Sequence, residues 1–555
     1  MLASLFLNPR FTFKSDGLSL LESLHVLKFE GEEEISRLFR FEITLISESP
    51  DIDLEKVLTG AASLTIRSLT GLNKAIYHGI LSEFEQMDRT GGYFTYRAVL
   101  VPRLWKLTLD QMNEVYVEDV SVPTLVQKVL KAGGLSSLDY SVVLKNPFGY
   151  RERTLITQYQ ESSFNFINRL MEREGIYFYF DHVGNSGGGD KLRITDFNES
   201  LPLLNIRLAI YVPPENVSPV NQDDAIIRFS SSRRRLPEKV LVQDYNYRKA
   251  SLTNGLTGEA QVTSSQGQGT VMYFGENIRN DSEASKMAKV RAEALSCQNE
   301  VFSGEALAVG IRSGYRLGFA GHYRLSNNGT YLVTRVRHIG SQEGVIDGTR
   351  VVEDELEKIV AGSYYRAKFE AISSSLQYRP ELRTPKPVIA GTLPAIVDGS
   401  GFGDQPEINE YGQYKVILMY DSSSKGASKA SSWVRMATPY AGSKNGMNFP
   451  LLKGTEVIIG FMGGDPDQPA ILGAITNSEN PNVVTSNNSH LNGFKTTSGN
   501  QMIISDDPLQ SYIQLSSPKS GCTITMGVVP IPSQPPVLPV SDVDMNDLLK
   551  LIENG

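Results

Sequence analysis

The chain has 555 residues, of which 40% are hydrophobic and 21% charged, and its formal net charge is -8. This length is too great for one ordinary core and predicts several domains, and the composition excludes a largely disordered chain. The negative charge argues against a surface that neutralises nucleic-acid phosphates, because such a surface needs a basic face. Two distant cysteines, Cys297 and Cys522, provide no disulfide framework, which favours folding in a reducing cytoplasm.

The first residues form a short apolar run, MLASLFL, without a basic leader or a small-residue cleavage site. We therefore expect no secretory signal. No apolar run reaches the roughly 18 residues that a membrane span requires. If the protein leaves the cell, we expect a route other than the general export pathway.

Residues 1–375 are expected to form one β-rich region with a few helices. Strand-like alternation is visible from Arg40 to Ile46 and from Tyr331 to Ile339. The segment SVPTLVQKVLKAGGL predicts a helix, because Pro123 suits a first turn and Gly133 a C-terminal stop.

Two further helices are expected in this region. In ESSFNFINRLMEREGIYFYF, Ser162 or Ser163 can cap the helix and Gly175 ends it. In NDSEASKMAKVRAEALSCQ, Asp281 or Ser282 is the expected cap. The apolar residues through which this last helix is expected to pack are Met287, Val290 and Leu295.

Residues 376–388 form a linker with Pro380, Pro385 and Pro387, which favour extended backbone. Residues 389–478 alternate in short strands that Gly, Pro, Ser and Asp clusters separate, which is typical of a small closed β-barrel. The strands expected there are Tyr414 to Tyr420, Trp433 to Ala437, Glu456 to Phe461 and Ala470 to Ala474.

A polar connector, residues 479–489, precedes a thin β-structure over residues 490–529. Its apolar residues stand at even offsets within short strands but cannot enclose a core alone. The simplest remedy is pairing with identical copies about a threefold axis, which buries them and satisfies the strand edges. The residues expected in this trimer core are Met502, Ile504, Ile513, Leu515, Ile524 and Met526.

Residues 530–555 form a proline-rich spacer and a short C-terminal helix. A helix this short needs a partner surface. Two interpretations stay open: a frayed tail, or a docking peptide for a cargo or tip protein. The residues that would dock are Leu548, Leu549 and Ile552.

No pattern in the chain indicates catalytic, cofactor-binding or metal-ligating chemistry. None of the six histidines falls in a HExxH spacing, and no G-x-S-x-G elbow or P-loop is present. His490 precedes the thin β-structure, so three copies could chelate a metal, but ordinary histidine is the favoured interpretation. The acidic run GGDPDQP, residues 463–469, could suit calcium, although a tight strand connection is favoured.

Two lines of the sequence resemble the VgrG spike proteins of type VI secretion. The first is RERTLITQYQESSFNFINRLMEREGIYFYF, which is similar to a line in the hub region of those proteins. The second is the barrel line, which is similar to their oligonucleotide/oligosaccharide-binding (OB) barrel. It runs through Gly412, Trp433, Val434, Arg435, Ala441, Gly442, Pro450, Gly454, Glu456, Gly460, Asp465, Pro466, Gly473 and Asn477.

Three departures leave the subfamily open. Met419 and Tyr420 stand where many members have an aromatic-proline-aromatic run, and Tyr440 stands where tryptophan is common. The segment that would form the needle is also short, and no C-terminal catalytic domain follows it.

The resemblance implies a mainly β, multidomain fold: β-barrel hub domains with a few helices, an OB barrel and a short trimeric β-prism needle. It implies no enzyme but a homotrimeric spike that punctures membranes at the tip of a contractile tail tube. The implied partners are the tube protein, baseplate components, a PAAR-like tip protein, and an effector or adaptor on the tail. Assembly would begin in the bacterial cytoplasm, and secretion would need no signal peptide.

Three alternatives remain. The chain could be the spike of a phage baseplate or of an extracellular contractile injector. It could be a cell-wall hydrolase. An OB barrel can also bind nucleic acid, but that use needs aromatic platforms among basic residues, and Trp433, Tyr440 and Phe461 have few such neighbours.

Overall fold

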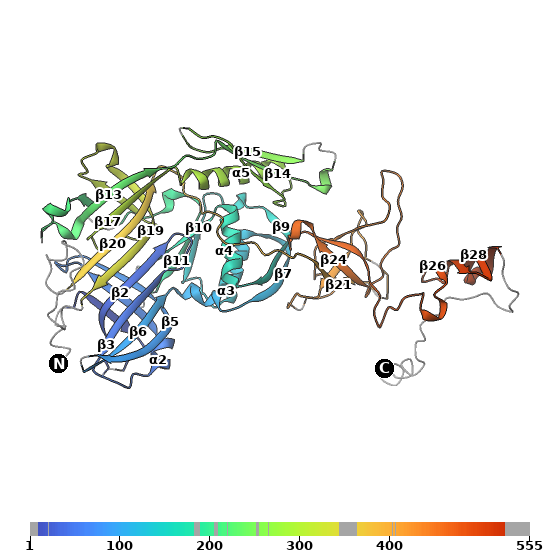
Figure 1. Ribbon diagram of the computed structural model, residues 1–555, viewed down its shortest axis with the longest axis horizontal. Helices are drawn as coiled ribbons and strands as arrows, with labels where there is room; N and C mark the ends of the chain where they lie inside the picture. Colours follow the sequence, from blue (N-terminus) through green and yellow to red (C-terminus); the bar gives the residue numbers. More distant parts are fainter. Residues whose placement is uncertain are drawn as a thin grey trace. The chain divides into compact units, whose positions relative to one another are not determined.

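A computed structural model describes residues 9–527 except 20–21, 91, 183–188, 205–208, 219, 251–254, 265, 343–362, 402, 406 and 424. The chain forms two compact units. Unit 1 is Met1–Val388 with Asp465–Gln468, and unit 2 is Ile389–Gly464 with Pro469–Gly555. Strands dominate both units (Figure 1), so the expectation of a mainly β protein with few helices is confirmed.

Unit 1 is built on a 12-stranded sheet that closes on itself twice. The first half, in the order β1-β4-β5-β6-β3-β2, closes because β1 also pairs with β2. The second half, β19-β18-β12-β13-β17-β20, closes because β19 also pairs with β20. Antiparallel pairing of β2 with β19 joins the two barrels. Closure removes the free edges that an open sheet would expose.

The strands of the first barrel are β1 (Phe11–Ser15), β2 (His25–Glu34), β3 (Arg40–Ser47), β4 (Ala61–Arg67), β5 (Lys74–Thr90) and β6 (Tyr93–Val101). The strands of the second barrel are β12 (Ala209–Tyr211), β13 (Ala225–Arg233), β17 (Glu300–Ala306), β18 (Arg316–Ala320), β19 (Gly329–Ser341) and β20 (Tyr364–Ser373).

The interior of the first barrel follows from the alternation in its strands. Phe41, Ile43 and Leu45 of β3 are buried at every second position, as the period of a strand requires. Gly31 of β2 leaves room for the ring of Phe41, because a Cβ at that position would lie 2.1 Å from a ring carbon. Only glycine therefore fits at this point of the interior.

Two smaller sheets and two helices lie between β6 and β12 in the sequence. The strands are β7 (Met112–Ser121), β8 (Tyr140–Val143), β9 (Glu152–Glu161), β10 (Tyr177–Asp181) and β11 (Lys191–Thr195), paired as β7-β9 and β10-β11-β8. The helices are α3 (Val122–Ala132) and α4 (Ser163–Glu174), and the short helix α2 (Leu54–Thr59) lies earlier in the chain.

Local sequence signals fixed the ends of α3 and α4. Gly133 ends α3, and the Ser162 hydroxyl caps α4 by accepting a hydrogen bond from the Asn165 amide. Gly175 ends α4 in the left-handed region, with φ 75°. These predictions are confirmed.

A third small sheet, β15-β14-β16, and helix α5 lie between β13 and β17 in the sequence. Their bounds are β14 (Lys239–Asp244), β15 (Leu256–Gln261), β16 (Thr270–Phe274) and α5 (Asp281–Ser296). The predicted caps of α5, Asp281 or Ser282, were one or two residues too late. Asn280 has extended backbone and its side chain accepts from the Glu283 amide, which leaves Asp281 in the first turn, where its charge favours the helix N-terminus.

Unit 2 begins with a five-stranded sheet in the order β22-β21-β24-β25-β23. An antiparallel bridge between Tyr414 and Val434 links the two ends of this order and closes the barrel. Val416, Val457 and Ile459 lie in its buried interior. The strands are β21 (Thr392–Asp398), β22 (Lys415–Leu418), β23 (Arg435–Met436), β24 (Glu456–Phe461) and β25 (Pro469–Ala474).

The C-terminal sheet of unit 2 is an antiparallel meander, β26-β27-β28-β29. Its strands are β26 (Leu491–Lys495), β27 (Gln501–Asp507), β28 (Gln510–Ser517) and β29 (Cys522–Gly527). Among the helices of the described ranges, none combines the length and the hydrophobicity that a bilayer-spanning segment requires.

Candidate functional site

The six residues predicted for a trimer core all lie on one face of the C-terminal sheet. The strand register places Met502 opposite Leu515, and Leu515 opposite Ile524. A second row runs parallel to the first, through Ile504, Ile513 and Met526. Directly opposed side chains are the contacts that stabilise a sheet face. The chain therefore presents two adjacent apolar rows, which we call the apolar face.

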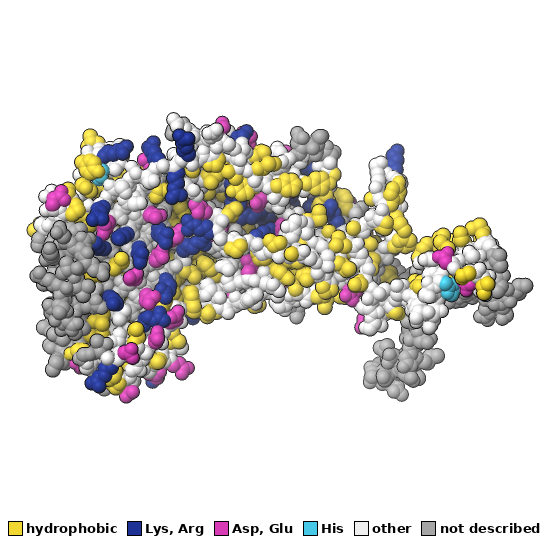
Figure 2. Space-filling model, viewed as in Figure 1, with side chains coloured by type: hydrophobic (Ala, Val, Ile, Leu, Met, Phe, Trp, Pro, Cys, Tyr) yellow, Lys and Arg dark blue, Asp and Glu magenta, His cyan; other side chains and the backbone are white. Residues whose placement is uncertain are grey.

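Part of the apolar face is open to solvent in the single chain, whereas Met502, Ile504 and Ile513 are half-buried. Leu515 is 45% exposed, Ile524 63% and Met526 57%. Phe494 of β26 extends the first row, opposite Met502, and is also exposed. Figure 2 shows hydrophobic side chains at the surface of this part of the molecule. Several large apolar side chains gathered on one exposed face indicate an interaction site.

The opposite face of the same sheet holds a small core of its own. Leu491, Ile503 and Tyr512 are buried there and form one cluster. The sequence did not predict this cluster, although Ile503 and Tyr512 occupy the alternate positions of the same strands. Gln501 and Gln514 are also buried on this face, and their Oε1 atoms have no hydrogen-bond partner among the described residues.

Two further expectations concern the ends of this region. His490 is exposed at the start of the sheet, and the described residues contain no group of three or more His, Cys, Asp or Glu side chains that could hold a metal. Leu548, Leu549 and Ile552 lie outside the described residues, so the docking role of the tail stays a prediction.

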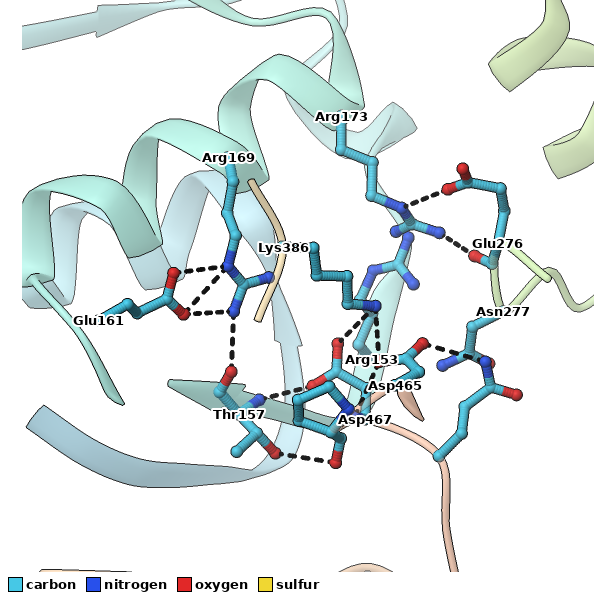
Figure 3. A network of polar contacts seen from close by, with 12 residues as sticks. Arg153, Thr157, Glu161, Arg169, Arg173, Glu276, Asn277, Lys386, Asp465 and Asp467 are labelled. Carbon is cyan, nitrogen blue, oxygen red and sulfur yellow. Dashed lines mark hydrogen bonds and ion pairs between the residues drawn. The ribbon is translucent and has the colours of Figure 1, made fainter. Parts of the chain in front are cut away.

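A network of buried polar contacts surrounds α4 in unit 1 (Figure 3). The Arg169 guanidinium binds both carboxylate oxygens of Glu161, at 2.6–3.0 Å, and also donates to the carbonyl of Thr157 at 2.8 Å. Burial raises the pKa of Glu161 even though Arg169 opposes this effect. The pair is therefore expensive to desolvate and depends on both partners.

The acidic loop Asp465–Gln468, which connects β24 to β25, belongs to this network. Asp467 accepts a hydrogen bond from the Thr157 amide at 2.7 Å, and the Thr157 hydroxyl donates to the Pro466 carbonyl at 3.3 Å. The Lys386 ammonium lies 2.6 Å from Asp465 and 3.6 Å from Asp467. A lysine thus holds the carboxylates that could have suited calcium, which agrees with the interpretation as a strand connection.

Glu172 of α4 binds the backbone within the segment predicted as a linker, residues 376–388. Its carboxylate accepts from the backbone amides of Arg383 and Thr384, at 3.0 and 2.9 Å, and from the Arg37 guanidinium at 3.2 Å. The Asn168 amide lies 3.2 Å away on the same helix. This buried carboxylate holds residues 383–384 to α4 within unit 1.

Arginines also surround Glu174 at the end of α4. Burial alone would raise its pKa, but Arg153, Arg173 and Lys286 together lower the pKa of Glu174 to about 2. Arg153 also pairs with Glu283 of α5 at 3.3 Å. The line of sequence around α4 therefore serves as a scaffold that binds α5, the linker and the acidic loop.

A second buried polar cluster joins strands of the two barrels. The Glu33 carboxylate accepts from the Tyr77 hydroxyl at 3.0 Å and the Ser313 hydroxyl at 3.2 Å, and contacts His338 Nε2 at 2.9 Å. The Tyr365 hydroxyl lies 2.9 Å from His338 Nδ1. The side chains of Glu33, Tyr77, His338 and Tyr365 are buried. The cluster ties β2, β5, β19 and β20 together.

The charges on the outside of unit 1 are mixed in sign. Figure 2 shows Lys and Arg interleaved with Asp and Glu over the visible face. Cross-strand ion pairs account for part of this pattern, such as Arg337 with Glu30 at 2.9 Å and Arg97 with Glu83 at 2.7 Å. In the barrel of unit 2, Lys415 lies over the Trp433 ring at 4.9 Å. That tryptophan already has a cation against its face.

Two known families match the chain and define its class, the hub and injector proteins of phage-like tails. Residues 32–344 match the family described as phage tail baseplate hub (GPD). Residues 411–475 match the type VI secretion system/phage-baseplate injector OB domain. The expected hub and OB barrel are thereby confirmed.

Individual relatives identify the family of the chain more specifically. It is 30% identical over 462 residues to the type VI secretion system spike protein VgrG1a of Pseudomonas aeruginosa, covering 81% of this chain and 67% of that protein. VgrG1b of the same organism is 29% identical over 82% of this chain and 59% of its own length. The chain therefore spans about two thirds or less of the length of these curated relatives. The chain belongs to the VgrG family of type VI secretion spike proteins.

The fold agrees with a solved structure. The E. coli c3393 protein, a type VI secretion component with structural similarity to the T4 bacteriophage tail proteins gp27 and gp5, has a TM-score of 0.58. It is 23% identical, and the match covers 84% of this chain and all of that chain. This similarity supports the fold.

Proposed function

We propose that three copies of the chain assemble into a spike at the tip of a type VI secretion tail tube. The observation that carries this proposal is the apolar face of the C-terminal sheet, which one chain leaves partly exposed. Three copies about an axis would bury it and give the continuous hydrogen bonding that a stiff needle requires. The proposed domain boundaries are those expected from the sequence: a hub over residues 1–375, a linker over 376–388, a barrel over 389–478 and a needle over 490–529.

In this proposal the protein acts mechanically and not by catalysis. Contraction of the tail sheath would drive the needle through the target membrane, and the work would come from the contracting machine. The hub would bind the tube protein and baseplate components, the needle a PAAR-like tip protein, and the tail an effector or adaptor. The protein would be made in the cytoplasm and leave the cell with the apparatus.

The mass of the purified protein in solution tests the assembly. A trimer has a mass of about 184 kDa, three times the 61.2 kDa chain. Multi-angle light scattering across a range of concentrations distinguishes this mass from that of a single chain. If the protein is still a monomer at the highest concentration, the proposed trimeric spike is wrong.

Two further experiments address catalysis and partners. Incubation of the purified protein with cell-wall sacculi should release no fragments, whereas robust release would favour a hydrolase. Removal of residues 531–555 should leave the trimer intact and abolish capture of a tip or effector protein. Unchanged capture would reject the docking role of the tail.

A further inference from the structure

The small sheet β15-β14-β16 of unit 1 is covered on one face. Helix α5 lies beside β14 and β15 (Figure 1). Val240 and Val242 of β14 point into a buried cluster with Met287 and Ala288 of α5. Gly258 of β15 permits this close approach, because a Cβ there would lie 2.2 Å from the backbone of the helix. This face of the sheet is complete within the chain.

The uncovered face of the sheet is polar along β15 and apolar along β16. On β15, Glu259 pairs with Lys239 of β14 at 3.0 Å, so these charges neutralise each other. On the β16 side, Met272 is 54% exposed and Phe274 70%. Tyr245, which follows β14, is 55% exposed. The apolar surface is therefore concentrated at one edge of the sheet.

That edge is strand β16. In the described part of the chain, β16 pairs only with β14, in parallel and without a register shift. Its sequence, TVMYF, contains no charged residue and no proline. Gly269 and Gly275 flank it with φ of 89° and 82°, which ends the strand sharply on both sides. Edge strands are normally protected by charges, prolines or bulges, and β16 has none of these.

We propose that the β16 edge is a docking site for an extended segment of another protein, which adds to the sheet as a fourth strand. Backbone hydrogen bonds to an edge strand supply affinity, and alternate side chains supply specificity. Met272 and Phe274 stand two residues apart on the uncovered face, a spacing of roughly 6.6 Å along the strand. The segment would place apolar side chains beside them.

The charges and the length of the edge define the occupant. No charge in β16 is available to pair with a charged partner strand, and Lys239 and Glu259 already pair with each other. The flanking glycines limit the paired length to about five residues. The occupant is therefore an uncharged strand of about five residues with apolar side chains at alternate positions.

A second copy of the chain is not the occupant that we propose. Antiparallel pairing of β16 with the same strand of another copy would generate a twofold contact, which does not belong in a threefold assembly. This one step relies on the proposed function. The docking site itself does not, because its geometry is complete within unit 1.

The test uses a fluorescent heptapeptide of alternating threonine and leucine as the probe, and the full-length protein. Fluorescence anisotropy should show saturable binding to the wild type. Met272→Lys should weaken binding at least about tenfold, because a charge on the apolar side would oppose the added strand. Thr257→Lys, on the polar β15 side of the same face, is the matched control and should bind like the wild type.

Two modified probes test whether the peptide binds as a strand. Each is N-methylated at every second amide, in one register or the other. Because only one set of amides faces β16, one of the two peptides should lose binding and the other should keep it. Equal binding of both, equal binding to Met272→Lys, or no saturable binding to the wild type would overturn the proposal.

Light scattering of the same samples separates this inference from the spike proposal. Peptide binding that Met272→Lys removes should persist whether the protein is trimeric or monomeric. A concentration-dependent increase in mass that Met272→Lys abolishes would instead show that β16 binds a second copy, and would overturn the assigned occupant. Equal thermal unfolding of the two lysine variants controls for their folding.

Discussion

Ile524→Asp is the substitution that most directly tests the apolar face. Ile524 is 63% exposed in the single chain and has no place in the buried cluster of Leu491, Ile503 and Tyr512. A carboxylate there should cost the single chain little, because water still reaches the site. The same carboxylate in a trimer core would be desolvated next to two copies of itself.

The expected loss can be estimated from burial. Full burial of an isoleucine side chain is worth about 1.5–3 kcal/mol, so the exposed part of Ile524 leaves roughly 1–2 kcal/mol to gain in each chain. Three chains lose about 3–6 kcal/mol in this way, and each desolvated carboxylate adds a penalty of roughly a few kcal/mol. Since about 1.4 kcal/mol is a factor of ten in affinity, the trimer constant should fall by several orders of magnitude.

Light scattering should therefore give a 61.2 kDa species for Ile524→Asp at concentrations where the wild type is trimeric. Ile524→Leu should preserve the trimer, because it keeps the apolar volume. Thr523→Asp carries the same charge one residue away, on the opposite face, and should also remain trimeric. If Ile524→Asp associates like the wild type, the apolar face is not the interface and the reasoning fails.

Three further predictions concern unit 1. Arg169→Ala leaves Glu161 buried without its partner and should destabilise unit 1 by about 3–5 kcal/mol, measured as a lower thermal transition. The pKa of Glu174 is lowered in the folded protein, so the ionised carboxylate stabilises the fold above pH 4.5, and this stabilisation is lost as the pH falls toward about 2. Glu174→Gln should lack this part of the pH dependence in acid titrations followed by circular dichroism. Gly175→Ala should lower the free energy of unfolding by about 1–2 kcal/mol, because the residue has a left-handed backbone. The added Cβ would also lie 2.8 Å from the Val290 side chain, which must move, and chemical denaturation would measure the total loss. An unchanged transition in Arg169→Ala or Gly175→Ala, or an unchanged acid profile in Glu174→Gln, would contradict the corresponding prediction.

Local signals in the sequence were sufficient for elements that depend on nearby residues. Ser162 and Gly175 define α4 because a cap and a left-handed stop act within one turn. The alternation in β27 and β28 likewise identified Met502 and Leu515 as one face of a sheet. The cap of α5 was missed by one or two residues because Asn280, Asp281 and Ser282 are all capping residues, and only the backbone conformation selects among them.

Contacts between distant residues could not be predicted in the same way. Thr157 and Asp467 are 310 positions apart, and nothing in either segment indicates the other. The sequence favoured a strand connection for the acidic loop, but it gave no sign that Lys386 lies beside Asp465. The exposed edge of β16 has the composition of a buried strand, and only the order of the sheet shows that it pairs on one side alone among the described strands.

The two units differ in how far a single chain satisfies their polar groups and buries their apolar side chains. In unit 1 the carboxylates Glu33, Glu161 and Glu172 are buried and fully engaged by donors from other elements. In the C-terminal sheet of unit 2, Ile524 and Met526 remain open on the apolar face. Stability that depends on protein concentration should therefore belong to the C-terminal sheet, because only association can bury a surface that the single chain leaves in water.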